Sequence, residues 1–314
     1  MTSDEIRMSR LEKFGKVGEI DELLKKDVNI VSYLTDNHKK ETSTEDEMIS
    51  YDLRAGLDLK NFHENPRLYK CISEKILSYI DEVGVKGGRI VECGAGEGIV
   101  LSEICKNPNC CFSWARGLDI SWSRTAYAQT NLINYDNSSI DIDFFVGDFF
   151  CLPFKDDSID VIYTMQGIYG MGGHEETLLR ELYRCSRKYL ILIEPCYELA
   201  GEKARERMNR LGYVKNLKGI AESLKFKVIK HELFGLDSNP LNPAAVLIIE
   251  KDDNNIFIDD AVCCPYSHGD LTRIGNALYC EKSKLSYPIL NGVACLTKEN
   301  AIVSSKLKDI CKKN

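Results

Sequence analysis

The sequence of 314 residues lacks any apolar run approaching ~20 residues, the length that a helix needs to cross a bilayer, so no membrane span is expected. Its opening stretch, MTSDEIRMSRLEKFGK, has no apolar segment of the kind that a secretion signal requires. An excess of positive charge is also lacking, because the formal net charge is −7 and the pI is about 5.4. This argues against a general nucleic-acid binder, and the 44% hydrophobic and 28% charged residues are typical of a globular protein.

Thirteen cysteines are present, an odd number, and they are scattered along the chain. Several lie inside or beside segments that look like core strands. This distribution favours buried thiols in a reducing compartment over a disulfide framework. We therefore expect a cytoplasmic protein.

The hydropathy pattern divides the chain into three parts. Residues 1–50 are expected to be a helical N-terminal extension that ends in a charged loop, Asp36–Glu47. Residues 51–251 alternate strand and helix patterns. Residues 256–314, beyond a polar break, have short strands and turns typical of a small α+β module. The apolar stripe of the extension consists of Leu11, Phe14, Val17, Ile20, Leu23 and Leu24.

The middle part predicts an α/β fold, a doubly wound and mostly parallel seven-stranded sheet of the Rossmann-like kind. The last two strands have no helix between them, so we expect them to be antiparallel neighbours. Strands are expected at 89–93, 115–119, 142–146, 159–164, 188–194, 226–231 and 245–250. Helices are expected at about 66–83, 98–106, 122–133, 175–186 and 203–223.

The most informative segment is residues 89–100, Arg-Ile-Val-Glu-Cys-Gly-Ala-Gly-Glu-Gly-Ile-Val. A short strand meets Glu92, and Gly94, Gly96 and Gly98 follow before a helix begins. Glycines let the backbone adopt positive φ and approach a ligand closely. The spacing is not the G-x-G-x-x-G of dinucleotide sites, and Glu92 would repel a phosphate but suit a cationic ligand. An ordinary glycine-bearing turn between strand and helix is the alternative.

The pattern resembles the first motif of class I S-adenosylmethionine (SAM) methyltransferases, and the resemblance extends over roughly residues 50–250. It implies SAM as the cofactor. The segment Asp156–Tyr163 resembles that of ubiquinone-biosynthesis-type methyltransferases, in which the residues after the strand, here Met165 and Gln166, line the cofactor.

Residues upstream of the first strand also resemble the family. The segment Tyr51–Gly56 is similar to its lid, so that Tyr51 or Arg54 would meet the methionine carboxylate of the cofactor. An ordinary loop with a solvated arginine is the alternative.

Two aspartates end the next two strands. Asp119, followed by Ile120, stands at a strand's carboxyl edge, where a carboxylate can accept both ribose hydroxyls of a nucleoside. In the family, the acid at the position of Asp148 accepts from the adenine amino group, and the next residue, here Phe149, packs on the ring. For both aspartates a turn or helix-capping role is the alternative.

Methyl transfer to a hydroxyl requires positioning of the nucleophile and removal of its proton. His174, just past the fourth strand, is the best candidate base, unless it only starts the following helix. Tyr169 and Glu194 are the next catalytic candidates, with structural roles as their alternatives. An Asn-Pro-Pro-Tyr type motif is lacking, which favours an oxygen or carbon nucleophile over an amide or base amino group.

Residues 263–296 resemble the small zinc-ribbon-like family that activates tRNA, rRNA and release-factor methyltransferases. The second cysteine of each metal-ligand pair is replaced by a serine, Ser267 beside Cys264 and Ser283 beside Cys280. Structural zinc requires four sulfur or nitrogen ligands, so we expect a metal-free module. A module this small must gain stability by packing on the methyltransferase domain, as a structural support or a contributor to acceptor binding.

Together these features predict a SAM-dependent methyltransferase that acts on a small polar acceptor. The fusion resembles those of surface-polysaccharide pathways, which favours a sugar or nucleotide sugar. An RNA or translation-factor methyltransferase and a non-catalytic SAM-binding protein are the alternatives. The basic segment 201–235 could hold a polyanion, although such a run is more often the solvated face of a helix; nucleic acid is not expected as a partner.

Overall fold

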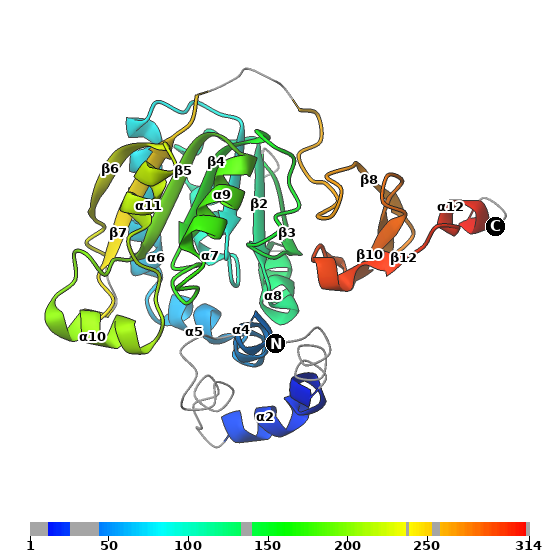
Figure 1. Ribbon diagram of the computed structural model, residues 1–314, viewed down its shortest axis with the longest axis horizontal. Coiled ribbons are helices and arrows are strands. Elements are labelled where there is room, and N and C mark those ends of the chain that lie inside the picture. The colour runs from blue at the N-terminus through cyan, green and yellow to red at the C-terminus, as the bar shows by residue number, and fades with distance from the viewer. Residues whose placement is uncertain (1–11, 26–43, 133–139, 237–238, 253–257, 312–314) are drawn as a thin grey trace.

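The computed structural model describes residues 12–25, 44–132, 140–236, 239–252 and 258–311 (Figure 1). Its central sheet has seven strands in the order β3-β2-β1-β4-β5-β7-β6. Strands β1 to β5 pair in parallel, and β7 is antiparallel to both β5 and β6. The predicted Rossmann-like sheet and its antiparallel ending are confirmed. The strands are β1 (Arg89–Cys93), β2 (Trp114–Asp119), β3 (Asp141–Val146), β4 (Ile159–Met165), β5 (Ser186–Pro195), β6 (Lys227–Leu233) and β7 (Ala244–Glu250).

The sheet is buried on both faces, because successive side chains of a strand point to opposite sides. On β1, Ile90 belongs to one apolar cluster and Val91 to the other. The first face is covered by α6 (Pro66–Glu82), α7 (Ile99–Lys106) and α8 (Trp122–Leu132). The second face is covered by α9 (Glu175–Cys185), α11 (Leu217–Ser223) and the C-terminal module.

The single helix expected at 203–223 is wrong. The structure has two helices there, α10 (Glu202–Arg210) and α11. Between them Gly212 has a φ of 66° and Asn216 a φ of 54°. Left-handed residues of this kind end a right-handed helix.

The N-terminal part contains α2 (Val17–Leu24), α4 (Thr44–Leu53) and α5 (Leu57–Glu64). Ile20 of α2 packs against Ile49 of α4, joined by the predicted stripe Phe14, Val17, Leu23 and Leu24. Leu11 of that stripe lies outside the described residues. Helix α4 begins inside the segment predicted as a loop, Asp36–Glu47, and crosses the domain boundary predicted after residue 50.

Asp52 explains why α4 is continuous with the main domain. Its Oδ1 accepts from the Ser123 N–H at 2.9 Å and from the Ser121 hydroxyl at 2.8 Å, at the start of α8. A carboxylate at the beginning of a helix satisfies free backbone N–H groups and interacts favourably with the helix dipole. This bond fixes the end of α4 beside the carboxyl ends of the central strands.

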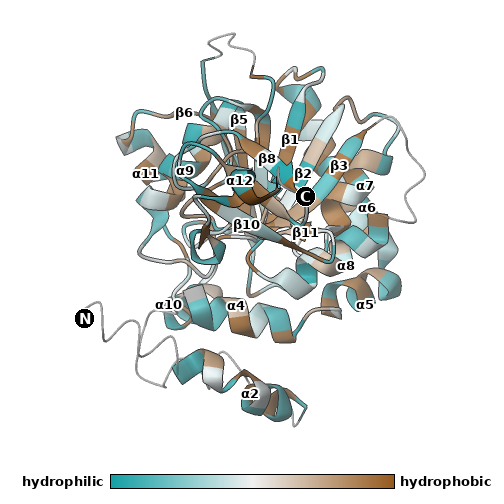
Figure 2. Ribbon diagram, turned by 90° about the vertical axis from the view of Figure 1, so that its right-hand side faces the viewer, coloured by the Kyte–Doolittle hydropathy of each residue, from teal (hydrophilic) through white to brown (hydrophobic). Residues whose placement is uncertain are grey.

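Residues 258–311 form a second, five-stranded sheet in the order β11-β10-β9-β8, with β12 paired to β10. Figure 2 views the molecule from the side of this module, which lies in front of the central sheet. Its elements are β8 (Leu271–Ile274), β9 (Ala277–Cys280), β10 (Leu285–Leu290), β11 (Val293–Ala294), the 3-10 helix η1 (Lys298–Asn300), β12 (Ile302–Val303) and α12 (Leu307–Cys311).

The module docks on the connection between β3 and β4. The Leu296 N–H donates to the Val146 carbonyl at 2.8 Å, and the Cys263 N–H donates to the Pro153 carbonyl at 2.8 Å. Cys264 and Tyr287 of the module belong to the same buried cluster as the second face of the sheet. The expected packing of this module on the methyltransferase domain is confirmed.

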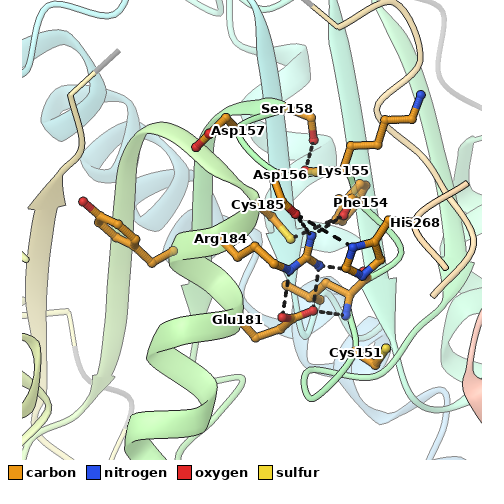
Figure 3. A network of polar contacts seen from close by, with 12 residues as sticks. Cys151, Phe154, Lys155, Asp156, Asp157, Ser158, Glu181, Arg184, Cys185 and His268 are labelled. Atoms are coloured by element: carbon orange, nitrogen blue, oxygen red, sulfur yellow. Dashed lines mark hydrogen bonds and ion pairs between the residues drawn. The ribbon is translucent and has the colours of Figure 1, made fainter. Parts of the chain in front are cut away.

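Beneath this junction lies a network of polar contacts centred on Arg184 of α9 (Figure 3). Its guanidinium donates to the Phe154 carbonyl at 2.8 Å, to Asp156 at 2.6 Å and to Glu181 at 2.7 Å. Glu181 in turn accepts from the Leu152 N–H at 2.8 Å. These bonds hold the β3–β4 connection in the shape that the module contacts.

None of the described helices combines the length and apolar character needed to span a membrane. All thirteen cysteines lie within the described residues, and no two of them form a disulfide.

Candidate functional site

The glycine turn follows β1 directly and has the geometry that its sequence predicts. Gly94, Gly96 and Gly98 all have positive φ, at 76°, 53° and 71°. A Cβ on Gly94 would lie 2.8 Å from the Cα of Gly167, so the turn and the segment after β4 are in backbone contact. Gly98 has a different reason to be glycine, since a Cβ there would lie 2.5 Å from the buried ring of Phe144.

A cavity of about 610 Å³ opens between this turn, the end of β4 and helices α4 to α6. This is the edge of an open α/β sheet where ligands bind. Of the residues predicted from the sequence, those that line the cavity are Tyr51, Arg54, Glu92, Gly94, Gly96, Met165, Gln166 and Tyr169. Those that are not among its lining residues are Gly98, Asp119, Ile120, Asp148, Phe149, His174 and Glu194.

Glu92 lies at the floor of the cavity and is buried. One of its oxygens accepts from the Leu101 N–H at 3.1 Å, and burial raises its pKa to about 8. Near neutral pH this side chain is therefore mostly protonated. The negative charge that the sequence assigned to Glu92 appears only when a cation lies close enough to lower its pKa.

Three groups that sequence reasoning missed supply fixed charge to the cavity. Glu97 accepts from the N–H groups of Gly56 and Leu59 at 2.7 and 2.6 Å, which ties α5 to the start of α7. Asp58 forms an ion pair with Arg124, and both line the cavity. Glu97 lies within the glycine motif and could have been noticed there, but the pairing of Asp58 with Arg124 depends on tertiary structure.

Asp119 is buried just behind the glycine turn. Its two oxygens accept from the N–H groups of Gly96 and Ser121, each at 2.9 Å, and burial raises its pKa. The bond to Ser121 is the one that the turn alternative predicts, and the bond to Gly96 fixes the glycine turn itself. The carboxylate is thus oriented toward the turn, with Arg124 close enough to favour its charged form.

Asp148 and Phe149 lie on the β3–β4 connection. The Asp148 carboxylate accepts from the Phe150 N–H at 2.9 Å, as a turn aspartate would, and burial raises its pKa. The buried ring of Phe149 lies against the glycine backbones, 3.1 Å from where a Cβ of Gly94 would be and 3.2 Å from that of Gly167. The ring of Phe149 therefore packs against both the glycine turn and Gly167.

The three catalytic candidates have different surroundings. His174 is exposed at the N-cap position of α9, and its ring lies edge-on to Phe150 with centroids 5.4 Å apart. The Tyr169 hydroxyl meets the Tyr51 hydroxyl at 2.9 Å on the cavity wall, and burial raises the pKa of both phenols. Glu194 is buried behind the wall, bonded to the backbone after β4, and burial raises its pKa to about 7.

The four motif positions of the module come together in its core. The Cys264 thiol lies 3.4 Å from the Ser283 hydroxyl and 3.1 Å from the Tyr287 hydroxyl. The Ser267 hydroxyl lies 3.4 Å from the Cys280 thiol. Within the described ranges, no group of three or more His, Cys, Asp or Glu side chains is placed to hold a metal ion.

Residues 90–188 match a protein family described as a methyltransferase domain. Over these residues the chain is similar to methyltransferases, which supports the expected enzyme class and the expected cofactor, SAM. No curated protein is detectably similar to the chain in sequence.

Several solved structures resemble the chain at low identity. Magnesium protoporphyrin IX methyltransferase from Synechocystis PCC 6803, with bound SAH, is 13% identical, with 59% of this chain and 84% of that chain covered and a TM-score of 0.47. A complex of the Haloferax volcanii Trm112 methyltransferase activator with a methyltransferase is 17% identical. The match covers 64% of this chain and 96% of that chain, with a TM-score of 0.48. A SAM-dependent methyltransferase from Methanococcus maripaludis is 19% identical. The match covers 63% of this chain and 94% of that chain, with a TM-score of 0.44. Likeness at this level carries no information about substrate.

Proposed function

We propose that the protein transfers a methyl group from SAM to a small, uncharged, hydroxyl-bearing acceptor, with a sugar as the leading class, in the cytoplasm. The observation that carries this proposal is the cavity at the carboxyl ends of β1 and β4, which combines a glycine turn with carboxylates. Gly94, Gly96 and Glu92 bind the cofactor there, and Asp119, Ile120, Asp148 and Phe149 serve its adenosine half.

The residues of the cavity fit the methionine half of SAM. Its ammonium and sulfonium are cationic, and Asp58 and Glu97 supply negative charge, to which Glu92 adds when a cation lowers its pKa. Its carboxylate is matched by Arg54, which is held by two bonds to Ser50, each 2.9 Å long. When bound, SAM supplies the transferable methyl group on its sulfonium.

The charge of the cavity favours an uncharged acceptor over a phosphate-bearing one. Among the lining residues that the structure describes, the cationic side chains are Arg54 and Arg124. Arg54 bonds to Ser50, and Arg124 is paired with Asp58. The lining also contains Glu64 and Asn61, which suit the hydroxyls of a sugar, whereas a nucleotide diphosphate or an RNA backbone would be repelled by the carboxylates.

The hydroxyl pair of Tyr51 and Tyr169 is suited to positioning the acceptor. Because burial raises the pKa of both phenols, they remain protonated at neutral pH and act as hydrogen-bond donors and acceptors rather than as bases. Catalysis then depends mainly on bringing the acceptor oxygen into line with the methyl group. His174, exposed and absent from the cavity lining, would need to move to act as the base.

The first test is calorimetric titration with SAM and with S-adenosylhomocysteine (SAH), followed by transfer of labelled methyl groups to a panel of free sugars and their phosphates. We expect micromolar binding and labelling of the uncharged sugars. Tyr169→Phe should slow this transfer, whereas Tyr213→Phe, which changes the neighbouring ring at 4.9 Å outside the cavity lining, should not. Failure of both SAM and SAH to bind would refute the proposal.

A second candidate is a SAM-binding protein without transferase activity. The observation that favours it is the position of His174 and Asp148, neither of which lines the cavity. Micromolar binding of SAH together with no labelling of any acceptor class, RNA included, would support this candidate.

A further inference from the structure

Glu194, at the end of β5, is a buried carboxylate whose surroundings differ from those of a catalytic acid. Its side chain is 3% exposed and absent from the cavity lining. Its Oε1 accepts from two successive backbone N–H groups, those of Gly167 at 3.0 Å and Ile168 at 3.3 Å. Both donors belong to the segment that follows β4.

That segment adopts a conformation that it would not hold unaided. Gln166 has a φ of 53°, in the left-handed region that is strained for a residue with a side chain. The Gln166 N–H still follows the sheet, donating to the Ile193 carbonyl at 2.8 Å, and the chain then turns sharply. Without Glu194, the N–H groups of Gly167 and Ile168 would lose their side-chain acceptor, which destabilises this conformation of the segment.

The same segment forms one wall of the cavity and touches the glycine turn. Met165, Gln166 and Tyr169 line the cavity. A Cβ on Gly167 would lie 2.8 Å from the Cys93 carbonyl oxygen, so this backbone is packed against the end of β1 without room to shift. The carboxylate, the segment 165–169 and the glycine turn therefore form a contiguous unit.

We propose that Glu194 is a positioning residue, which holds the segment 165–169 against the glycine turn and so sets the shape of the SAM-binding cavity. It acts through the backbone N–H groups of Gly167 and Ile168 and does not touch the reacting atoms. This inference rests on the proposed function, because the cavity is taken to be the SAM site.

The test compares two substitutions by calorimetric titration with SAH. Glu194→Ala removes the acceptor of both N–H groups, and we expect the Kd for SAH to rise at least tenfold. Glu194→Gln keeps a carbonyl oxygen in the same place, and we expect its Kd to stay within about threefold of the wild-type value. If Glu194 were instead a catalytic acid, both variants would bind SAH as tightly as the wild type.

Asp160 offers a matched control at the other end of β4. It is 4% exposed, accepts from the Arg89 N–H at 2.8 Å, and lies at the amino end of β4, whereas the cavity lies at the carboxyl end. Asp160→Ala should lower the unfolding temperature as much as Glu194→Ala does and leave the Kd for SAH unchanged. An equal loss of SAH affinity in both alanine variants would overturn the proposal, since general destabilisation would then explain it.

A measurement on the wild type guards against a Glu194→Ala variant that does not fold. Hydrogen exchange should find the amides of Gly167 and Ile168 protected to the same degree as those of β4, and equally so in Glu194→Gln. Exchange as fast as that of an open loop would overturn the proposal. Wild-type protein that fails to bind SAH would instead refute the proposed function and leave the role of Glu194 in the fold to the exchange data.

Discussion

The cavity and the core of the C-terminal module are both places where motif residues converge, and they differ in how their polar groups are satisfied. In the cavity, Glu97 and Glu92 accept hydrogen bonds from backbone N–H groups, and about 610 Å³ of space lies in front of them. In the module, Cys264 and Ser283 bond to each other, as do Ser267 and Cys280. The carboxylates anchored by backbone N–H groups leave room for a ligand, whereas the thiol–hydroxyl pairs fill the core of the module.

The sharpest test of this comparison is to complete a set of four thiols in the core of the module. In a tetrahedral zinc site with Zn–S bonds of about 2.3 Å, neighbouring sulfurs lie roughly 3.8 Å apart, close to the 3.4 Å between Cys264 and Ser283. The double variant Ser267→Cys with Ser283→Cys should therefore bind one zinc ion per chain and unfold at a higher temperature.

Elemental analysis after dialysis, with each single variant as the control, checks this expectation. The single variants have only three of the four thiols and should retain less than a full equivalent of zinc. A double variant that holds no more zinc than the wild type would mean that the four positions do not converge as a ligand set.

The next largest effect is expected in the glycine turn. Gly94→Ala would place a Cβ 2.8 Å from the Gly167 backbone, so we expect SAH affinity to fall about 100-fold or more, as measured by calorimetry. Gly84→Ala is the matched control, because Gly84 has the same φ of 77° but no atom within 4 Å of a new Cβ. It should cost about 1 kcal/mol of stability and leave binding intact.

A smaller effect is expected at the junction between the two regions. Arg184→Ala removes bonds to two carbonyls and two carboxylates beneath the module, and should lower the free energy of unfolding by about 2 kcal/mol. Arg180→Ala, on the same helix, changes only an exposed pair with Glu176 and should cost less than about 0.5 kcal/mol. Urea unfolding of both variants measures the difference, and equal losses would contradict it.

A pH-dependent effect is expected at Glu92, the buried carboxyl that lines the cavity. Because its folded pKa of about 8 lies above the ordinary value of 4.5, Glu92 stabilises the fold fully below pH 4.5 and progressively less as the pH rises toward 8. In Glu92→Gln the free energy of unfolding should fall less steeply with pH than in the wild type, by up to ~1.4 kcal/mol per pH unit. Urea unfolding between pH 5.5 and 8.5 checks this, and parallel curves for both proteins would show that Glu92 is not protonated there.

Local sequence was sufficient to predict the scaffold of the site. The strand predicted at 89–93 coincides with β1, and the glycine turn follows it, because a short apolar run and a series of glycines are local properties. The gap between α10 and α11 could not be found this way. The partners of Glu194 and the pairing of Asp58 with Arg124 were also beyond reach, since they join residues that are 27 and 66 positions apart.

The assignment of roles was less accessible than the fold. Tyr169 was predicted as catalytic and Tyr51 as cofactor-binding, yet their hydroxyls meet at 2.9 Å and form a single feature. His174 was favoured for its chemistry and its place after β4. A residue in the loop between a strand and the next helix can face either the solvent or the cavity. Which of these it faces depends on how α9 packs, and a single sequence does not contain that information.

The docking of the module on the β3–β4 connection also has a consequence for biosynthesis. The Cys151 thiol contacts the carbonyl of Pro265, 114 residues further along, and Val146 pairs with a still later segment. A ribosome adds roughly 5–20 residues per second, so the stretch that contains Asp148 and Phe149 waits several seconds after its own synthesis for its last neighbours. The segment that we propose to bind adenosine is therefore complete only after residues 263–296 have been synthesised, and products of a stalled ribosome that end before them would lack these contacts.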